Sequence, residues 1–292
     1  PRLISSAASD VYKRQNLALN IEKTIKYAEN LIDKGCHGVV FFGSTGQSQL
    51  ISLSEKIQLI NLLPKSNYRD KFIIGTGLNS LVDNINLIKI AKSNGFNKFL
   101  IMPPAYYKYS DHDVINFYSR IIDEINECKI ILYNFEKLSG YKFSIDCVEE
   151  LVKKFPSQIV GVKDSSYNLY ENLKIDNFSV MPGSESKLLK GLELGCSGII
   201  TATTNVTSIL ARDVYDKFQN GSDQSSNEKL CLVRSIFDKF NLISGLHTFM
   251  AQIDQDYQNL IPPLKLLNEN EKKIFFDELQ KLDFDFKHLK AA

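Results

Sequence analysis

The sequence has few of the residues that hold metals or disulfides, and it arranges none of them as a site. Its five cysteines are odd in number and scattered, without a CxxC pair, and its four histidines lie far apart. The spacing therefore predicts no metal centre. Scattered cysteines of this kind are typical of reduced core thiols, so we expect a reducing, cytoplasmic setting.

The sequence also lacks an excess of charge and a long apolar run. Its 35 basic and 34 acidic residues leave a formal net charge of +1, which gives no electrostatic hold on a nucleic acid or an anionic membrane. No apolar run approaches the roughly 18 residues of a membrane span, and none has the layout of a signal peptide. We therefore expect neither a nucleic acid nor a membrane as a partner.

The apolar content is sufficient for a full core. The 292 residues are 43% hydrophobic, which suits a globular protein with one large α/β domain or two small ones. No linker, low-complexity tract or internal boundary divides the chain, so a single large domain is favoured.

Short apolar runs and amphipathic stretches alternate along the chain from residue 20 onward. Strands are expected at residues 38–42, 72–76, 98–102, 130–134, 159–163, 179–181 and 198–201. Helices are expected from residue 21 to Gly35, at residues 54–63, 81–94, 111–127, 144–155, 169–174 and 185–194, and in a tail at 208–219, 227–242 and 270–282. Strict alternation of this kind requires parallel strands joined by right-handed crossovers.

The alternation predicts an α/β fold, a (β/α)8 TIM barrel with a C-terminal helical extension. A closed barrel of this kind has eight strands. Seven are recognisable, so we interpret the first strand as missing or replaced in this sequence. An open doubly wound sheet is the alternative, but no G-x-G-x-x-G follows the first recognisable strand. Residues 1–15 show no strand or helix period, and we interpret them as a non-native or disordered segment. Residues 16–220 then form the barrel, and residues 221–292 form the extension packed on it.

Lys163 is the most unusual residue of the expected strands. It ends the apolar run Ile159-Val160-Gly161-Val162, which indicates a strand buried on both faces. Burying an ammonium group is costly, and a buried lysine is commonly a neutral, nucleophilic amine that attacks a carbonyl carbon and forms a Schiff base. The alternative is a lysine that merely extends past a strand end into solvent.

Other polar residues fall at the carboxyl ends of strands, where such a barrel places its site. Gly43-Ser44-Thr45-Gly46 sets two hydroxyls between glycines and suits either an anion-binding turn or an ordinary capped turn. Tyr133 stands one βα unit before Lys163, so the two are expected on neighbouring strand ends, where a phenol can carry protons. The segment Pro103-Pro104-Ala105-Tyr106-Tyr107 brings two more phenols to the end of another strand.

These motifs resemble the dihydrodipicolinate synthase and N-acetylneuraminate lyase family, the pyruvate-type class I aldolases. The resemblance rests also on Gly161-Val162-Lys163-Asp164, Tyr133-Asn134 and Gly198-Ile199-Ile200 with Asn205. It runs from about residue 20 to the last expected strand and more loosely into the tail. It implies an enzyme whose imine forms with the substrate itself, without a cofactor or a metal.

The resemblance also implies a role for each motif residue. Lys163 forms the Schiff base with the 2-oxo group of pyruvate or of a pyruvate-containing sugar acid, and Tyr133 is the general acid/base. Ser44 and Thr45 bind the substrate carboxylate, and one of them links Tyr133 to Tyr107, which a neighbouring subunit contributes. A homodimer or homotetramer follows. Further substrate-binding residues are implied at Gly43, Leu138, Glu185 and Ile200.

Departures from the family pattern concern the substrate. Leu138 stands where dihydrodipicolinate synthases carry an arginine that grips the carboxylate of the aldehyde, and Leu138-Ser139-Gly140 resembles the sialic acid lyases. Glu185 is then a candidate for binding substrate hydroxyls. Gln47 replaces the usual glutamate of the G-[ST]-T-G-E motif, and Glu136 replaces a proline.

We therefore expect a Schiff-base-forming aldolase or lyase that cleaves or forms a C–C bond between pyruvate and an aldehyde. Its substrate would be a hydroxylated 2-oxo acid, like N-acetylneuraminate or like a 2-keto-3-deoxy sugar acid. Three alternatives stay open: a 4-hydroxy-tetrahydrodipicolinate synthase of lysine biosynthesis, a sugar-acid dehydratase of the same family, and an inactive barrel that acts as a binding protein.

Overall fold

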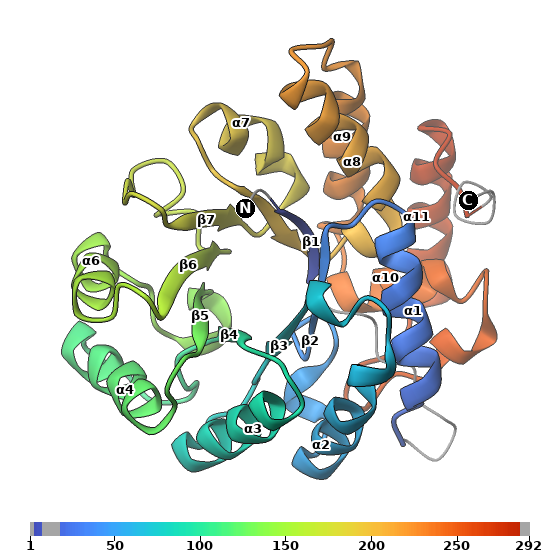
Figure 1. Cartoon of the computed structure of the whole chain (residues 1–292). Helices are drawn as coiled ribbons and strands as arrows, with labels where there is room; N and C mark the ends of the chain where they lie inside the picture. The colour runs from blue at the N-terminus through green and yellow to red at the C-terminus, as the bar shows by residue number, and fades with distance from the viewer. Residues whose placement is uncertain (1–2, 8–17, 287–292) are drawn as a thin grey trace.

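The computed structural model describes residues 3–7 and 18–286, and its centre is one sheet of eight parallel strands. Figure 1 shows the strands arranged in a ring with helices on its outside. The strands follow one another in the order β7-β6-β5-β4-β3-β2-β1-β8. They are β1 (Leu3–Ala7), β2 (Gly38–Phe41), β3 (Phe72–Gly75), β4 (Lys98–Ile101), β5 (Lys129–Asn134), β6 (Ile159–Asp164), β7 (Ser179–Pro182) and β8 (Gly198–Thr201).

The two ends of this strand order meet. The backbone N–H of Ser197, just before β8, donates to the carbonyl oxygen of Val180 in β7 at 3.0 Å. Every strand therefore has a neighbour on both sides, which leaves no open sheet edge among them. The expected (β/α)8 architecture is the one observed.

Alternation of side chains along the strands divides the core into two layers. One apolar cluster fills the inside of the ring and consists of Val40, Ile73, Leu100, Ile131, Tyr133, Met181 and Ile200. The neighbouring strand residues, such as Val39, Phe41 and Phe99, join the larger cluster between the strands and the helices. Successive side chains of a strand point to opposite faces. These strands are buried on both faces, and for this reason they appear in the sequence as continuous apolar runs.

The helices begin mostly at serine or asparagine residues, whose side chains accept hydrogen bonds from the first backbone N–H groups. Ser52, Ser110 and Asn268 each form a reciprocal capping box with an acidic residue three positions later. The barrel helices are α1 (Ile21–Asp33), α2 (Leu53–Leu62), α3 (Leu81–Ser93), α4 (Asp111–Glu124), α5 (Glu136–Ser139), α6 (Ile145–Lys154), α7 (Leu188–Glu193) and α8 (Thr204–Gln219). Short 3-10 helices lie at η1 (Ser48–Leu50), η2 (Leu63–Lys65), η3 (Arg69–Lys71), η4 (Glu185–Lys187) and η5 (Gln255–Gln258).

The first strand is present, which corrects the prediction that it is missing; its replacement by a foreign segment stays a prediction. Residues Leu3–Ala7 form β1, which pairs with β2 through Ser5 and Gly38 and with β8 through Leu3 and Gly198. A run of five residues is too short to show the alternation of a strand in the sequence. In the structure, backbone pairing with a strand on either side holds this segment in the ring. Residues 8–15 of the excluded segment lie outside the described residues, and the foreign origin of the segment stays a prediction.

Two further differences concern helices. The expected helix at residues 169–174 is absent: this segment forms turns, and the carboxylate of Asp164 accepts backbone N–H groups of Tyr167, Leu169 and Tyr170. A helix that the sequence did not predict, α10 (Leu242–Met250), follows α9 (Ser225–Phe237) in the tail.

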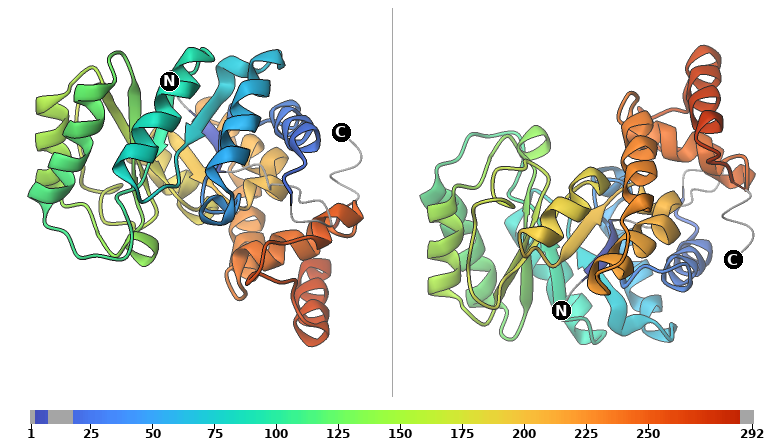
Figure 2. Two further views of the ribbon diagram at one scale, coloured as in Figure 1. Left: turned by 90° about the horizontal axis from the view of Figure 1, so that it is seen from below. Right: turned by 90° about the horizontal axis from the view of Figure 1, so that it is seen from above.

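Aromatic residues pack the helices of the C-terminal extension against one another. Phe237 of α9 meets Phe275 of α11 (Glu269–Lys281) edge to face at 4.9 Å between ring centroids, and Phe249 of α10 lies at 6.1 Å from Phe237. Figure 2 shows this orange-to-red part of the chain reaching beyond one side of the barrel. The helices of the described part of the chain include none that is both long and apolar enough to span a membrane.

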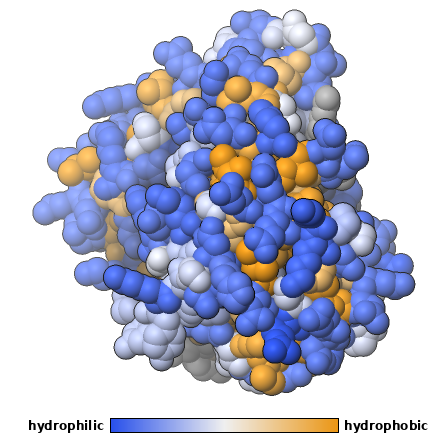
Figure 3. Space-filling view, turned by 90° about the vertical axis from the view of Figure 1, so that its left-hand side faces the viewer, coloured by the Kyte–Doolittle hydropathy of each residue, from blue (hydrophilic) through white to orange (hydrophobic). Residues whose placement is uncertain are grey.

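The exterior of the barrel carries mixed polar and apolar side chains. The face drawn in Figure 3 is mostly hydrophilic, and its hydrophobic side chains occur in small groups between polar ones. Single apolar residues at a surface are normal for globular proteins, so this face gives no indication of a large apolar interface.

Candidate active site

Lys163 lies inside the barrel mouth beside Tyr133. The ladder between β5 and β6 pairs Tyr133 with Lys163 directly, as the spacing of one βα unit predicts. The lysine is only 3% exposed, and its Nζ lies 4.1 Å from the centroid of the Tyr133 ring. The ammonium or amine therefore sits over an aromatic face rather than in solvent, and no carboxylate is within salt-bridge distance of it among the described residues.

Ser44 joins this pair from the turn after β2. Its Oγ lies 2.9 Å from the phenol oxygen of Tyr133, and either hydroxyl can be the donor. Thr45, the next residue, is buried and lines the same cavity. We call Ser44, Tyr133 and Lys163 the Lys163 group. It comprises a hydroxyl pair and an amine, the chemistry needed to move protons next to a nucleophile.

The Lys163 group opens into a cavity of about 450 Å³. That volume accommodates a small-molecule substrate. Its wall is formed by strand ends, by the loops that follow them, and by helix α9 with the residues after it. The lining residues are Ser44, Thr45, Tyr133, Phe135, Glu136, Lys137, Lys163, Ser165, Ser166, Tyr167, Gly183, Ala202, Arg234, Asp238 and Leu242.

Asp164 fixes the backbone on which Lys163 stands. Its buried carboxylate accepts the side-chain N–H of Asn134 at 2.8 Å and backbone N–H groups of Tyr167, Leu169 and Tyr170 at 2.9–3.0 Å. These four bonds tie the ends of β5 and β6 to the loop that borders the cavity. Sequence reasoning gave Asp164 and Asn134 no structural role, although the dipeptides Tyr133-Asn134 and Lys163-Asp164 contained the signal.

Gln47 attaches the turn of Ser44 and Thr45 to the C-terminal extension. Its side-chain amide donates to His247 Nε2 at 3.1 Å, and its Oε1 accepts the backbone N–H of Ile261 at 2.9 Å. His247 Nδ1 lies 2.8 Å from the carbonyl oxygen of Tyr257, which fixes that nitrogen as the donor. Burial lowers the pKa of His247 to about 4, so the ring is neutral at pH 7 and can accept from Gln47.

Two of the predicted site residues lie beside the main cavity. Gly43 and Leu138 line a neighbouring cavity of about 160 Å³, which shares Ser44 and Tyr133 with the main one. Leu138 is about half exposed there. The position therefore offers an apolar surface, not a cation, close to Tyr133.

Tyr107 and Ile200 do not line the main cavity of this chain. Tyr107 is 68% exposed and contacts the ring of Tyr106 edge to face. Ile200 is fully buried inside the ring of strands. A contact of either side chain with substrate stays a prediction, and for Tyr107 that prediction requires a second subunit.

Glu185 does not reach the cavity directly, which differs from the direct hydroxyl contact expected from the sequence. Its carboxylate is fully buried, accepts the hydroxyl of Thr201 at 2.8 Å, and forms an ion pair with Arg234 at 2.8 Å. Arg234 in turn lines the cavity together with Asp238. Burial by itself lowers the pKa of Arg234, but the carboxylates of Glu185 and Asp238 outweigh it and raise that pKa above its ordinary value.

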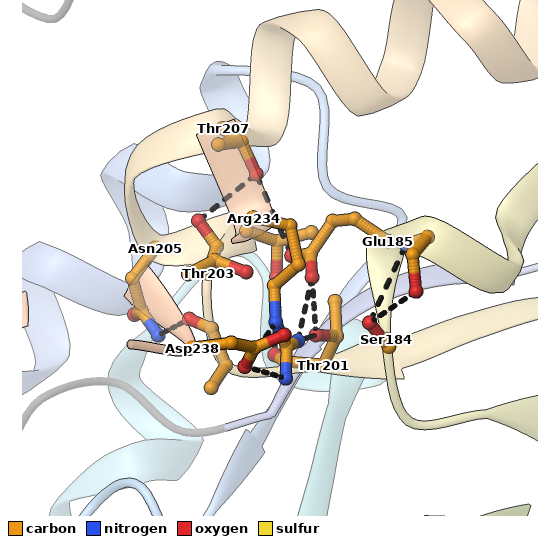
Figure 4. Close-up of polar contacts among 11 residues, drawn as sticks. Ser184, Glu185, Thr201, Thr203, Asn205, Thr207, Arg234 and Asp238 are labelled. Atoms are coloured by element: carbon orange, nitrogen blue, oxygen red, sulfur yellow. Dashed lines mark hydrogen bonds and ion pairs between the residues drawn. The ribbon is translucent and has the colours of Figure 1, made fainter. Parts of the chain in front are cut away.

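Glu185, Thr201, Arg234 and Asp238 form what we call the Arg234 cluster, drawn in Figure 4. Sequence reasoning did not identify Arg234, Asp238 or Thr201. An arginine and an aspartate four residues apart in a tail helix resemble any surface ion pair. Only the packing of α9 against the barrel brings them to the cavity.

Comparison with known proteins gives consistent matches over most of the chain. The model of the dihydrodipicolinate synthetase family matches residues 3–282. A protein of Chloroflexus aurantiacus named uncharacterized DapA-like lyase is 29% identical over 279 residues, which are 92% of this chain and 93% of that protein. The 4-hydroxy-tetrahydrodipicolinate synthase of Methanopyrus kandleri is 28% identical over 292 residues, 97% of this chain and 95% of that enzyme.

A solved structure shows the same fold. It is a prophage protein of the dihydrodipicolinic acid synthase family from E. coli K12 in complex with pyruvate. It superposes with a TM-score of 0.86 at 22% identity, over 97% of this chain and 99% of that one.

Proposed function

Because the chain belongs to the dihydrodipicolinate synthetase family, whose members are class I pyruvate-dependent aldolases and lyases that form a Schiff base, we propose a more specific reaction for it. It cleaves, or forms, the C–C bond between pyruvate and a hydroxylated aldehyde. Its substrate is then a hydroxylated 2-oxo acid, like N-acetylneuraminate or like a 2-keto-3-deoxy sugar acid.

One observation carries the proposal: a buried lysine, a phenol and a serine hydroxyl meet at the wall of one cavity. Lys163 Nζ lies over the Tyr133 ring at 4.1 Å, and the Tyr133 hydroxyl lies 2.9 Å from Ser44 Oγ. In the proposed reaction Lys163 adds to the 2-oxo carbon, and loss of water gives a protonated imine. Tyr133 moves the protons that this addition and dehydration require.

The imine makes cleavage possible without any other electron acceptor. The C4 hydroxyl loses its proton, the C3–C4 bond breaks, and its electron pair passes into the imine to give an enamine and a free aldehyde. Protonation of the enamine at C3 and hydrolysis of the imine then release pyruvate and restore Lys163. Ser44 and Thr45, with the backbone of their turn, hold the carboxylate so that the 2-oxo carbon faces the amine.

In this proposal the covalent imine takes the place of a cofactor. The exposed Tyr107 would extend the chain of hydroxyls from Ser44 only in a neighbouring subunit, so we propose a homodimer or homotetramer as the working assembly. The matched family and the pyruvate complex of the E. coli K12 protein support pyruvate as the shared part of the substrate.

The second candidate is a 4-hydroxy-tetrahydrodipicolinate synthase, the name of the Methanopyrus kandleri relative. That reaction condenses pyruvate with an aldehyde that carries a carboxylate. A side chain able to grip that carboxylate is expected near Tyr133, where this chain has the half-exposed Leu138. Losing a bidentate arginine clamp costs about 2–3 kcal/mol of binding, which favours the uncharged aldehyde.

A substrate panel tests the choice between the two candidates. N-acetylneuraminate and 2-keto-3-deoxygluconate are assayed for pyruvate release, and pyruvate with aspartate semialdehyde is assayed for condensation, each at equal enzyme concentration. We expect turnover of at least one of the two sugar acids. Turnover of the semialdehyde pair alone would replace the proposed substrate class by the second candidate.

A further inference from the structure

Helix α9 brings a charged group to the wall of the cavity that contains Lys163. Arg234 Nη1 donates to Glu185 Oε2 at 2.8 Å and to Thr201 Oγ1 at 3.0 Å. Its Nε and Nη2 each lie 2.9 Å from Asp238 Oδ1. Figure 4 shows the guanidinium between the two carboxylates, with Glu185 on the barrel side and Asp238 at the end of α9.

The charges of this cluster do not cancel at the cavity. Glu185 is fully buried and compensates the charge of Arg234 within the protein. Asp238 supplies a second carboxylate to the same cation, and its side chain is 50% exposed. The hydrogen bond from Arg234 Nε and the ion-pair contact from its Nη2 both end on Oδ1, and no hydrogen bond from the described residues ends on Oδ2. Asp238 lines the cavity, and the charges of Glu185, Arg234 and Asp238 sum to −1.

The position of Asp238 is not one that helix stability favours. It is the C-terminal cap of α9, where backbone carbonyls carry negative partial charge and a carboxylate is disfavoured. Arg234, one turn earlier, compensates that repulsion. Helix stability alone therefore does not account for a carboxylate at this position.

We propose that Asp238 binds the hydroxyl groups of the substrate's polyol part and thereby selects polyhydroxylated aldehydes over anionic ones. A hydroxyl can donate to Oδ2 and also accept from Arg234, which uses three of its five N–H groups in the hydrogen bonds to Glu185, Thr201 and Asp238. A carboxylate or phosphate can only accept, and it would meet the charge of Asp238. This inference rests on the proposed function and names the residue that recognises its substrate.

Glu185 acts in this arrangement through Arg234. Its buried carboxylate holds the guanidinium, and the guanidinium orients Asp238. Glu185 is thus a positioning residue. The sequence predicted that Glu185 binds substrate hydroxyls, and in this proposal Asp238 binds them instead.

Aldol addition of pyruvate to three aldehydes tests the proposal. Glyceraldehyde carries two hydroxyls, glycolaldehyde one and acetaldehyde none, and Asp238→Asn keeps the shape of the side chain but removes its charge. We expect the variant to raise KM for glyceraldehyde about tenfold, the size of one charge-assisted hydrogen bond. The increase should be smaller for glycolaldehyde and absent for acetaldehyde. Asp277→Asn, at an exposed site on α11 outside the cavity wall, is the matched control and should change none of the three.

Reduction of the pyruvate adduct with borohydride separates the possible failures. The wild type and Asp238→Asn should both gain the pyruvate-derived mass, because the imine does not depend on Asp238. If they do, and KM changes equally for all three aldehydes or for none, Asp238 does not recognise hydroxyls and the inference is wrong. If the wild type gains no mass, the proposed function itself is refuted, and the inference with it.

Discussion

The two polar groups at the cavity wall are built in different ways. The Lys163 group stands on strand ends of the ring, and its members are brought together by the β5–β6 ladder and the turn after β2. The Arg234 cluster depends on a tail helix packed against the barrel, and its members come from η4, β8 and α9. In the proposed function the first group carries the Schiff-base chemistry. We propose that the second, which depends on the tail helix, selects the substrate.

Removing the phenol from the Lys163 group should have the largest effect on activity. Tyr133→Phe keeps the ring under Lys163 but removes the hydroxyl that lies 2.9 Å from Ser44. Turnover should fall by about 10²–10⁴-fold, the usual contribution of a general acid/base, while thermal stability stays close to that of the wild type. Steady-state kinetics and a melting curve measure both.

Tyr167→Phe is the control for this change, because the phenol of Tyr167 lines the same cavity but is not hydrogen-bonded to Ser44. A similar loss of turnover in both variants would mean that the phenol of Tyr133 has no special part in proton transfer.

Removing a charge from the Arg234 cluster should lower the free energy of unfolding more than it lowers the rate of the reaction. Glu185→Gln leaves the buried guanidinium with only the half-exposed Asp238 as its counter-charge. Unfolding in urea should show a loss of about 3 kcal/mol, because a buried charge loses its partner. Asp216→Asn, which breaks the exposed pair with Arg212 on α8, should cost less than about 1 kcal/mol.

Equal losses in Glu185→Gln and Asp216→Asn would show that burial of the Arg234 cluster carries no energetic weight. The two groups at the cavity wall would then differ in position but not in their coupling to the fold.

The contact between the Ser44 turn and the extension should depend on pH. Burial lowers the pKa of His247 to about 4, below its ordinary value of 6.5. Between those values the unfolded chain binds a proton that the folded protein excludes, so His247 lowers the free energy of unfolding as the pH falls from 6.5 towards 4. The loss should approach about 3 kcal/mol, following from about 1.4 kcal/mol per pKa unit.

Unfolding curves at pH 7, 6, 5 and 4 for the wild type and His247→Gln measure this contribution. The variant should be less stable at pH 7 and should lose less stability on acidification. Parallel curves for the two proteins would exclude His247 as the source.

The sequence predicts the Lys163 group better than the Arg234 cluster, and the reason is physical. Lys163 and Tyr133 follow continuous apolar strands, and parallel pairing puts residues one βα unit apart on neighbouring strand ends. Their proximity could therefore be derived from spacing. Glu185 was assigned to the substrate through the resemblance to the sialic acid lyases, but its side chain points into the protein towards Arg234.

The elements that the sequence missed depend on tertiary contacts. Nothing local marks Leu3–Ala7 as a strand, and it is fixed by pairing with β2 and β8. The helix expected at residues 169–174 is replaced by turns, whose first backbone N–H groups bond to the buried carboxylate of Asp164. In the sequence, Arg234 and Asp238 resemble an ordinary helical ion pair. Only the packing of α9 against the barrel shows that they line the cavity.

The central claim is that the amine of Lys163 captures the 2-oxo group of pyruvate, and one measurement tests it most directly. The protein is incubated with pyruvate, reduced with borohydride, digested, and the modified peptide is located by mass spectrometry, with Lys163→Ala and the surface variant Lys239→Ala in parallel. We predict a pyruvate-derived mass on Lys163 in the wild type and in Lys239→Ala, and none in Lys163→Ala. An unmodified Lys163 in the wild type, or an adduct that persists in Lys163→Ala, would contradict the account.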